Sequence, residues 1–525
     1  MPATAAKTTK SPGPDASTLA VGTLIAGCLA VCLAQIGLAI PATLNGLFQS
    51  ELHPVGSQLT WISDAFLLPV AVLELTFGVL GDLFGRKRLL VGGALLMAVG
   101  EVVSASSDGV HQLWAGQALA GLGAAALFPT SLAVIAAGTR THTQRARVIA
   151  LWAACLSTGG FLAPLLGGIT ATYGSWRWSF VVVVAIALAS ALVSALLAQN
   201  SRAPEGRSLD PAGQITIGLG LFALLYAIIQ GPTDGWGSTP VLAGFLLAAV
   251  FLAAFVFAEL RVKSPLLRLD LFRNRSFAVA SAVAVVGMFS FLGTAYAVSI
   301  RLGPVQEQKP MHTAMAFLLL NGLALALLPV TERLLKHVAP GLVLTGGLVL
   351  IAGGDFWAAS LPITDEAFTS LILPLGLIGV GFAITVSSIT ATAVNTVPQH
   401  LAGMASATTN LLRDFGFTLG PAVIGAVALS RAASHFGSSL HASALPDATK
   451  GAAAAVLEEG GPLAVNGASE ASPVLKPAHS LAMDALGHGY SIGFVVCGAA
   501  ALLSALLALV ALRGRSAGVD EAAGA

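Results

Sequence analysis

Runs of about twenty apolar residues recur along the whole chain, and charged side chains fall almost entirely in the connectors between them. Each run is long enough to cross a hydrocarbon layer about 30 Å thick. Only 10% of the 525 residues are charged, against about 25% in a typical soluble protein. The runs show no strict two-residue alternation, so the spans are helices rather than barrel strands. The sequence therefore predicts an all-α polytopic membrane protein.

The apolar runs predict fourteen transmembrane helices, an even number that puts both termini on one side of the membrane. Nineteen of the 26 Lys and Arg residues lie in the tails and connectors of that side, and six lie on the other. Because cytoplasmic connectors carry the excess of Lys and Arg, we expect both termini in the cytoplasm. The helices are expected near residues 19–43, 57–80, 89–107, 112–137, 147–171, 178–198, 213–230, 240–260, 277–300, 313–330, 340–360, 369–393, 404–430 and 489–513.

Two pairs of glycine-rich stretches recur at nearly the same offset. AGLGAAA from Ala120 resembles IGVGFAI from Ile378, and GGFLAPLLGG from Gly159 resembles GFTLGPAVIG from Gly416. Two six-helix repeats separated by two further helices account for this spacing, and chance similarity of glycine-rich helices is the competing explanation. Duplicated halves that rock about a central site are common in secondary transporters.

This repeat predicts the domain organisation. The connector at 431–488 is rich in Ala, Gly, Ser and Pro, and we expect an extracytoplasmic loop that is partly helical or disordered. It is either a tolerated insertion or an element for gating or partner binding. The expected parts are a disordered cytosolic tail at 1–18, an N-terminal six-helix bundle at 19–198, two intervening transmembrane helices at 213–260, a C-terminal six-helix bundle at 277–513 and a cytosolic tail at 514–525.

The connector GVLGDLFGRKRLL, residues 78–90, concentrates one carboxylate and three cations in a chain poor in charge. It resembles the signature loop of the major facilitator superfamily, with matches that include Gly78, Asp82, Gly85, Arg86 and Lys87. The resemblance implies that this loop latches one conformation of a transporter through contacts across the interface between the halves. Alternatively, the cations only set the topology.

The next cytosolic connector carries Arg140 and Arg145. We expect one of them to pair with Asp82.

The stretch GGFLAPLLGG at 159–168 resembles the glycine–proline motif of antiporters in the same superfamily. Together with SWRWSF at 175–180 and LDPAG at 209–213, it fits the fourteen-span drug:proton antiporter branch. Proline removes a backbone donor and glycine removes bulk, so such a helix can bend and approach its neighbours closely. Helix packing alone is the alternative role. The residues concerned are Gly160, Pro164, Gly167 and Gly168, with Gly420 and Pro421 in the second half.

Ionisable residues inside the predicted spans are informative because each costs about 2.5–3.5 kcal/mol near a helix centre. Glu74 and Glu101 lie deep in their spans, so each is expected to be paired or protonated. Asp64 and Asp355 lie nearer the outer ends, where they either act in transport or simply reach water. Arg413 and Asp414 are expected to form a buried charge pair.

The antiporter branch commonly has an aspartate in its first helix and an arginine in its fourth, where this chain has Cys32 and Gln117. The resemblance would assign proton handling to those two positions. We therefore expect Glu74 and Glu101 to bind the transported proton, with Asp64 as a third candidate.

A substrate cavity is expected between the halves. Amide side chains there are either substrate contacts or bonds between helices, and aromatic ones either line the cavity or pack against lipid or core. The candidates are Gln35, Gln117, Trp152, Phe291, Phe317, Asn321 and Asn410.

The leading prediction is a proton-coupled exporter of amphipathic drugs or antibiotics in a bacterial plasma membrane, a monomer with a small-molecule substrate. A facilitator or importer not driven by protons is the alternative. A membrane enzyme or sensor is the remote alternative, since the sequence has no catalytic dyad or metal motif.

The chain also lacks an ATP-binding motif of the form Gly-x-x-x-x-Gly-Lys-Ser/Thr, and no basic tract indicates nucleic acid. We expect no cofactor, with a proton gradient as the driving force. The four cysteines lie in apolar runs and predict packing, not a disulfide or metal site.

Overall fold

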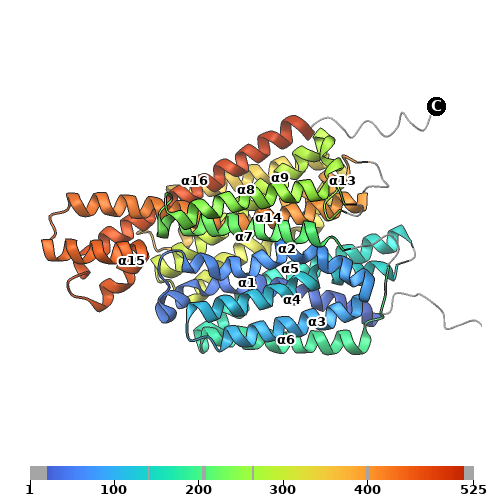
Figure 1. Ribbon diagram of the computed structural model, residues 1–525, viewed down its shortest axis with the longest axis horizontal. Helices are drawn as coiled ribbons and strands as arrows, with labels where there is room; N and C mark the ends of the chain where they lie inside the picture. The colour runs from blue at the N-terminus through green and yellow to red at the C-terminus, as the bar shows by residue number, and fades with distance from the viewer. Residues whose placement is uncertain (1–20, 140, 204–208, 263–264, 398–401, 513–525) are drawn as a thin grey trace, which may run out of the picture.

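Fourteen helices in the described part of the chain are long and apolar enough to cross a membrane, which confirms the predicted number. The computed structural model describes residues 21–139, 141–203, 209–262, 265–397 and 402–512, and this part contains no β-strand. The helices run side by side in one elongated bundle (Figure 1). We call its two ends the Gly85 end, where the signature connector lies, and the α15 end, opposite to it. The predicted tails at 1–18 and 514–525 lie outside the described residues.

The first six helices form the N-terminal half. They are α1 (Val21–Leu52), α2 (Gln58–Phe84), α3 (Arg86–Ala105), α4 (Val110–Ala137), α5 (His142–Tyr173) and α6 (Trp176–Leu197).

The C-terminal half consists of six spans, two of which include a π-helical segment, η2 or η3. They are α9 (Arg275–Ile300) with η2 (Arg301–Val305), α10 (Pro310–Phe317) with η3 (Leu318–Gly322) and α11 (Leu323–His337), α12 (Pro340–Ser360), α13 (Phe368–Val394), α14 (Ala402–Ala442) and α16 (His479–Leu512).

The repeated glycines make equivalent contacts in the two halves. A Cβ atom on Gly123 of α4 would lie 2.5 Å from the carbonyl oxygen of Gly93 in α3. A Cβ atom on Gly381 of α13 would lie 2.6 Å from the carbonyl oxygen of Gly347 in α12. Without a side chain at these positions, the two helices of each pair pack backbone to backbone. The same local packing has therefore been kept in both copies of the repeat.

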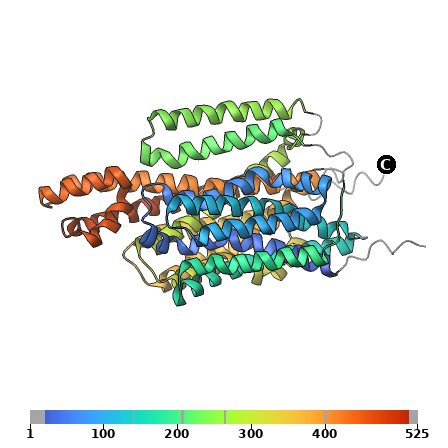
Figure 2. The same cartoon turned by 60° about the horizontal axis from the view of Figure 1, so that its bottom comes forward.

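Helices α7 (Pro211–Asp234) and α8 (Thr239–Glu259) form a hairpin outside the two halves (Figure 2). Leu225 and Ile229 of α7 pack in one buried cluster with Ala422 of α14, joined by Trp61 and Leu68 of α2. The hairpin therefore lies along the seam between the N-terminal and C-terminal halves. A short 3₁₀ helix, η1 (Leu269–Arg273), then leads into α9.

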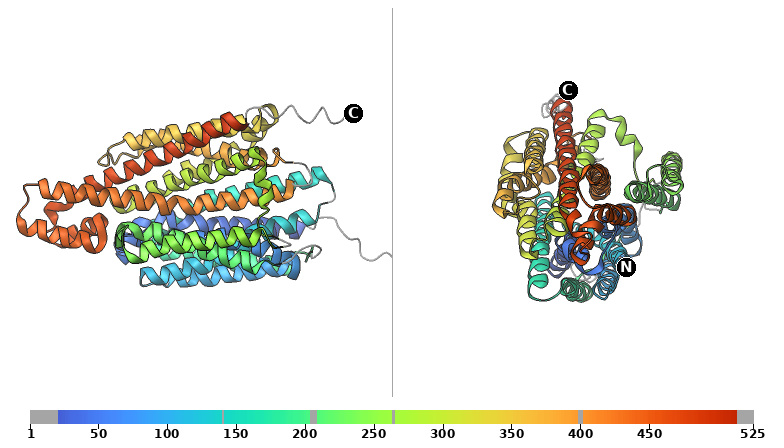
Figure 3. Two further views of the ribbon diagram at one scale, coloured as in Figure 1. Left: turned by 45° about the horizontal axis from the view of Figure 1, so that its top comes forward. Right: turned by 90° about the vertical axis from the view of Figure 1, so that its left-hand side faces the viewer.

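The connector at 431–488, expected to be partly helical or disordered, is mostly helical. Helix α14 runs on to Ala442, α15 covers Asp447–Ala471, and η5 (Lys476–Ala478) leads into α16, which begins at His479. These segments project from the bundle at the α15 end, which faces the viewer in the right-hand view of Figure 3. They have their own buried core, which includes Phe436 and Val465. Alanine favours helix, and this core stabilises segments whose Gly, Ser and Pro content suggested a loop.

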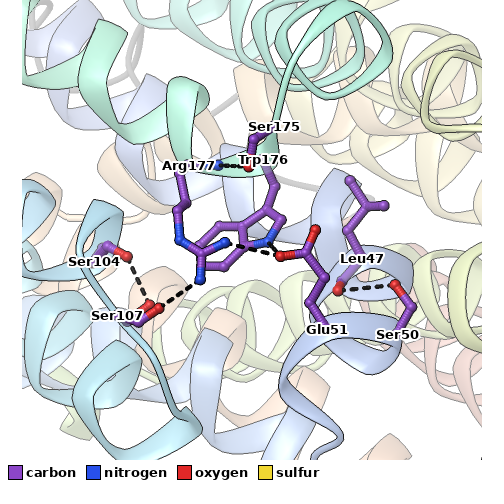
Figure 4. A network of polar contacts seen from close by, with 8 residues as sticks. All are labelled: Leu47, Ser50, Glu51, Ser104, Ser107, Ser175, Trp176 and Arg177. Atoms are coloured by element: carbon purple, nitrogen blue, oxygen red, sulfur yellow. Dashed lines mark hydrogen bonds and ion pairs between the residues drawn. The ribbon is translucent and has the colours of Figure 1, made fainter.

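A polar network holds the N-terminal half together at the α15 end (Figure 4). The Glu51 carboxylate at the end of α1 accepts hydrogen bonds from the Trp176 indole at 2.7 Å and from Arg177 at 2.9 Å. Arg177 also donates to the Ser107 carbonyl, at 3.0 Å, in the α3–α4 connection. The SWRWSF stretch thus ties α6 to α1 and to the α3–α4 turn.

Candidate functional site

Two adjoining cavities lie between the halves, in the middle of the bundle. They have volumes of about 70 and 80 Å³, whereas pockets for drug-sized ligands measure about 300–1,000 Å³. This conformation therefore has to widen before such a molecule can bind. The walls come from α1, α2, α4 and α5 on one side and from α9, the α10–η3–α11 span, α13 and α14 on the other. Residues lining both cavities are Gln35, Leu38, Leu67, Asn321, Phe382 and Phe417.

The C-terminal wall of the cavities is aromatic. The rings of Phe291 and Phe382 stack with their centroids 3.6 Å apart and their planes 7° from parallel. Phe317 and Phe417 extend the same wall. Aromatic faces of this kind suit a flat apolar ligand.

Two amides lie on opposite sides of the cavity. Gln35 belongs to α1 and Asn321 to the π-helical segment η3. A Cβ atom on Gly160 of α5 would lie 3.8 Å from the Gln35 Nε2 atom and 3.8 Å from the Asn321 Cβ atom. Glycine at this position keeps the space between the two amides open. The π-helical turn at Asn321 agrees with the frequent occurrence of such turns at functional sites.

Toward the α15 end, direct contacts between the halves close the cavities. We call three of them the seal. Asn45 donates to the Ser299 hydroxyl at 2.9 Å, and the Thr60 and Tyr296 hydroxyls are hydrogen-bonded at 2.7 Å. In the third contact, a Cβ atom on Gly46 would lie 2.8 Å from the Cα atom of Gly303. The backbones of α1 and η2 are therefore in contact at this point.

A charge cluster joins the halves at the cavity wall. Arg413 donates to its neighbour Asp414 through two nitrogens, at 3.0 and 3.3 Å, and both line one cavity. This geometry agrees with the predicted buried charge pair. Glu74 of α2, on the N-terminal side, lies close enough to interact electrostatically with the Asp414 carboxyl and the Arg413 guanidinium, and its Oε2 atom has no hydrogen-bond partner in the described part of the chain. The cluster therefore places two carboxyls and one guanidinium, from both halves, beside the cavity.

The other buried acids lie away from this cluster. Asp64 and Glu101 are fully buried, and their carboxyl oxygens have no hydrogen-bond partner in the described part of the chain. Asp355 is also fully buried and accepts hydrogen bonds from Thr294 at 2.7 Å and Ser290 at 3.5 Å. The alternative that Asp64 and Asp355 reach water is therefore wrong in this conformation, because neighbouring helices cover both carboxyls. None of the three acids lines either cavity.

The signature connector is ordered around Arg86. Its guanidinium forms an ion pair with Asp82 at 2.7 Å and donates to the Ala133 carbonyl at 3.2 Å and to Ser201 at 3.3 Å. Gly85 has a φ of +111°, a backbone conformation that favours glycine, where α2 turns into α3.

Asp82 and Ala133 belong to the N-terminal half, and Ser201 lies in the connection that follows α6. The expected reach of this side chain across the interface is therefore not seen in this structure. The expected pairing partner Arg140 lies outside the described residues. Gly78 is less constrained than Gly85, since a Cβ atom there would have only an ordinary contact, 3.7 Å from Pro129.

The glycine–proline motif positions α5 and α14 against their neighbours. A Cβ atom on Gly167 would lie 2.3 Å from the Thr43 hydroxyl. A Cβ atom on Gly168 would lie 2.6 Å from the Cβ atom of Ala314 in the opposite half. On Gly420 it would lie 2.6 Å from the Gly293 nitrogen. These residues therefore allow close packing. Pro164 and Pro421 lie inside their helices, and Pro421 lines a cavity.

Three of the predicted cavity residues lie elsewhere. Gln117 of α4 is fully buried and donates a hydrogen bond to Ser104 of α3 at 3.0 Å. It therefore joins two helices, which was the expected alternative to a substrate contact. Trp152 donates to Ser131 of α4 at 2.9 Å, and Asn410 lines neither cavity.

Gln35, Phe291, Phe317 and Asn321 do line the cavities. Sequence reasoning missed Phe382, Phe417 and Tyr296. The sequence signal that could have found the first two is their place in α13 and α14, helices already expected to line the cavity.

The comparisons with known proteins agree with this architecture. The Major Facilitator Superfamily model matches residues 27–421. The tetracenomycin C resistance and export protein of Streptomyces glaucescens is 28% identical over 95% of this chain and 93% of its own length. The multidrug resistance protein Stp of Mycobacterium tuberculosis is 30% identical over 70% of this chain and 68% of its own.

Among solved structures, a bacterial homolog of the human lysosomal transporter Spinster has a TM-score of 0.64 at 15% identity. That alignment covers 94% of this chain and 98% of the other. The peptide transporter POT in complex with sulfate has a TM-score of 0.61 at 15% identity, with 93% of both chains covered. At these identities the likeness concerns the fold alone.

Proposed function

Because the chain belongs to the major facilitator superfamily, we propose that it exports amphipathic drugs or antibiotics from a bacterial cytoplasm in exchange for protons. Relatives that align over most of its length include an export protein for tetracenomycin C and the puromycin resistance protein pur8 of Streptomyces alboniger. The superfamily is one of transporters, not of enzymes. The small, aromatic cavity between the halves supports an amphipathic cargo.

The observation that carries the proton coupling is the cluster of Glu74, Arg413 and Asp414. Its net charge is −1 when both carboxyls are ionised and zero when one holds a proton. It borders the cavity and also joins the two halves, so binding or loss of a proton changes both the cavity charge and the attraction between the halves. A group that couples a proton to alternating access needs both properties.

We rank Glu101 and Asp64 behind Glu74. Glu74 lies beside Arg413 and Asp414, which line a cavity, whereas Asp64 and Glu101 line neither cavity and do not belong to this cluster.

The proposed cycle uses the seal as its outer gate. With the Gly85 end in the cytosol, as the distribution of Lys and Arg predicts, the seal lies toward the outside. The structure then corresponds to a state closed to the outside. Opening the seal and closing the opposite end of the cavity would expose the cargo to the exterior, where a proton would replace it.

A sensitivity screen of expressing cells would first identify an exported compound, and transport of that compound in proteoliposomes would then test the coupling. We expect an imposed pH gradient to drive accumulation by the unmodified protein. Glu74→Gln should lose this accumulation but keep counterflow of the compound without a gradient. Glu366→Gln, an acid-to-amide change at an exposed position of the α12–α13 connection, is the control and should behave like the unmodified protein.

A facilitator or importer not driven by protons is the second candidate. Cys32 and Gln117, which replace the usual titratable groups of the branch, favour it. Counterflow that is insensitive to a pH gradient in the unmodified protein would support this candidate and refute proton coupling. Gradient-driven transport that is intact in Glu74→Gln but lost in Glu101→Gln would move the coupling site to Glu101.

A further inference from the structure

A groove with a volume of about 470 Å³ lies on the outer surface of the N-terminal half, apart from the transport cavities. It is formed at the Gly85 end, where α3 begins and α6 ends. Its walls are Lys87, Arg88, Val91, Gly92, Ala195 and Asn200. Two cationic side chains and one amide thus lie beside a small apolar surface formed by Val91, Gly92 and Ala195.

The two cations of the groove are available to a ligand. Arg86 is occupied by Asp82, Ala133 and Ser201, as described above. The side chains of Lys87 and Arg88, by contrast, have no hydrogen-bond or ion-pair partner in the described part of the chain. The signature connector therefore separates its cations into one that holds the fold and two that line the groove.

The floor of the groove continues into a surface that faces lipid. Arg88, Gly92, Leu95 and Val99 follow one another at helical spacing on one face of α3, and the last two are 45% and 54% exposed. On the facing helix α6, Leu192 is 60% exposed. An apolar strip therefore leads from the cations toward the middle of the membrane.

We propose that this groove binds the headgroup of an anionic phospholipid of the cytoplasmic leaflet. The phosphate lies between Lys87 and Arg88, the Asn200 amide donates to the headgroup oxygens, and the acyl chains follow the strip on α3 and α6. Charge complementarity selects this occupant, because a basic pocket between transmembrane helices on the cytoplasmic side suits an anionic headgroup. An apolar strip of this kind suits acyl chains and no soluble anion.

Gly92 offers a way to close the groove without changing its charge. A Cβ atom on this residue would meet no other atom within 4 Å. A larger side chain would thus extend into the groove and occupy the space of the lipid. Replacing a helical glycine also favours the helix, so the fold should be retained.

The test is native mass spectrometry of the purified full-length protein, titrated with phosphatidylglycerol or with phosphatidylcholine of the same acyl chains. We expect one phosphatidylglycerol to bind in preference to phosphatidylcholine. Each cation near an anionic headgroup contributes about 1 kcal/mol, so the double variant Lys87→Gln, Arg88→Gln should bind about 30-fold more weakly. Gly92→Leu should abolish this binding while eluting as the unmodified protein does in size-exclusion chromatography.

The matched control is Arg333→Gln, Lys336→Gln, which removes two exposed cations from the same end of the bundle. It should retain the affinity of the unmodified protein. Equal binding of the two lipids would overturn the proposal. So would unchanged phosphatidylglycerol affinity in both the double variant and Gly92→Leu, or an equal loss of affinity in the control.

Discussion

Substitution of Gly46 by alanine should open the seal at the α15 end. The new Cβ atom would lie 2.8 Å from the Cα atom of Gly303, about 1 Å closer than two carbon atoms in ordinary contact. The atoms it meets belong to the backbone of η2 and cannot rotate away. The halves must therefore separate at this point, or the closed state must bear the overlap.

The size of the effect follows from the cost of overpacking. An inserted methyl group in a tightly packed interface costs about 1–3 kcal/mol. That cost falls on the closed state alone, because opening separates Gly46 from Gly303. The ratio of open to closed molecules should therefore rise by about 5- to 150-fold.

The assay is the labelling rate of a single cysteine under the seal, in a background where the four native cysteines are alanine. Ser63→Cys suits this purpose because Ser63 lines the cavity nearer the seal. A membrane-impermeant maleimide added to intact cells should label it faster when Gly46→Ala is present. Gly353→Ala on α12 is the control, since its Cβ atom would meet nothing within 4 Å. An unchanged labelling rate in Gly46→Ala, or an equal increase in Gly353→Ala, would refute the reasoning.

Three further substitutions test individual contacts. Tyr296→Phe removes the hydrogen bond to Thr60 across the seal, worth about 1 kcal/mol, and should raise the same labelling rate about five-fold. Arg413→Gln leaves Asp414 without its cation and should destabilise the protein by about 3–5 kcal/mol if that carboxyl stays ionised; a thermal unfolding midpoint equal to that of the unmodified protein would contradict this. Glu101→Gln should leave the midpoint unchanged or raise it, because the carboxyl it replaces has no described hydrogen-bond partner, and a marked fall would indicate a partner that the structure lacks.

The number of spans was predictable because the hydrocarbon thickness sets the length of every apolar run. The residues at which the helices end were less predictable. Helix α14 continues to Ala442 and α16 begins at His479 because the segments between them have their own core around Phe436. That core depends on contacts between segments far apart in sequence, which local hydropathy does not register.

The candidate site was predictable in part, for a similar reason. The position of a residue along its helix indicated its depth in the membrane, and this identified both Glu74 and Glu101 as candidate proton-binding residues. Which of them meets the cavity-lining Arg413 and Asp414 depends on how each helix is rotated: Glu74 does, whereas Glu101 lies against α1 in its own half. Gln117 likewise binds Ser104 on the neighbouring helix. The signature connector indicated a latch, and in this conformation Asp82 forms an ion pair with Arg86, one turn away on the same connector.

The central claim is that cargo and proton compete at the Glu74–Asp414 pair. The most direct test adds an exported compound to the purified protein in weakly buffered detergent solution. The measurement is the number of protons released per molecule of compound bound. The account predicts that, across a series of pH values, release reaches a maximum approaching one proton per bound compound and that it disappears in Glu74→Gln. Release that persists in Glu74→Gln, or compound binding with no release at any pH, would contradict it.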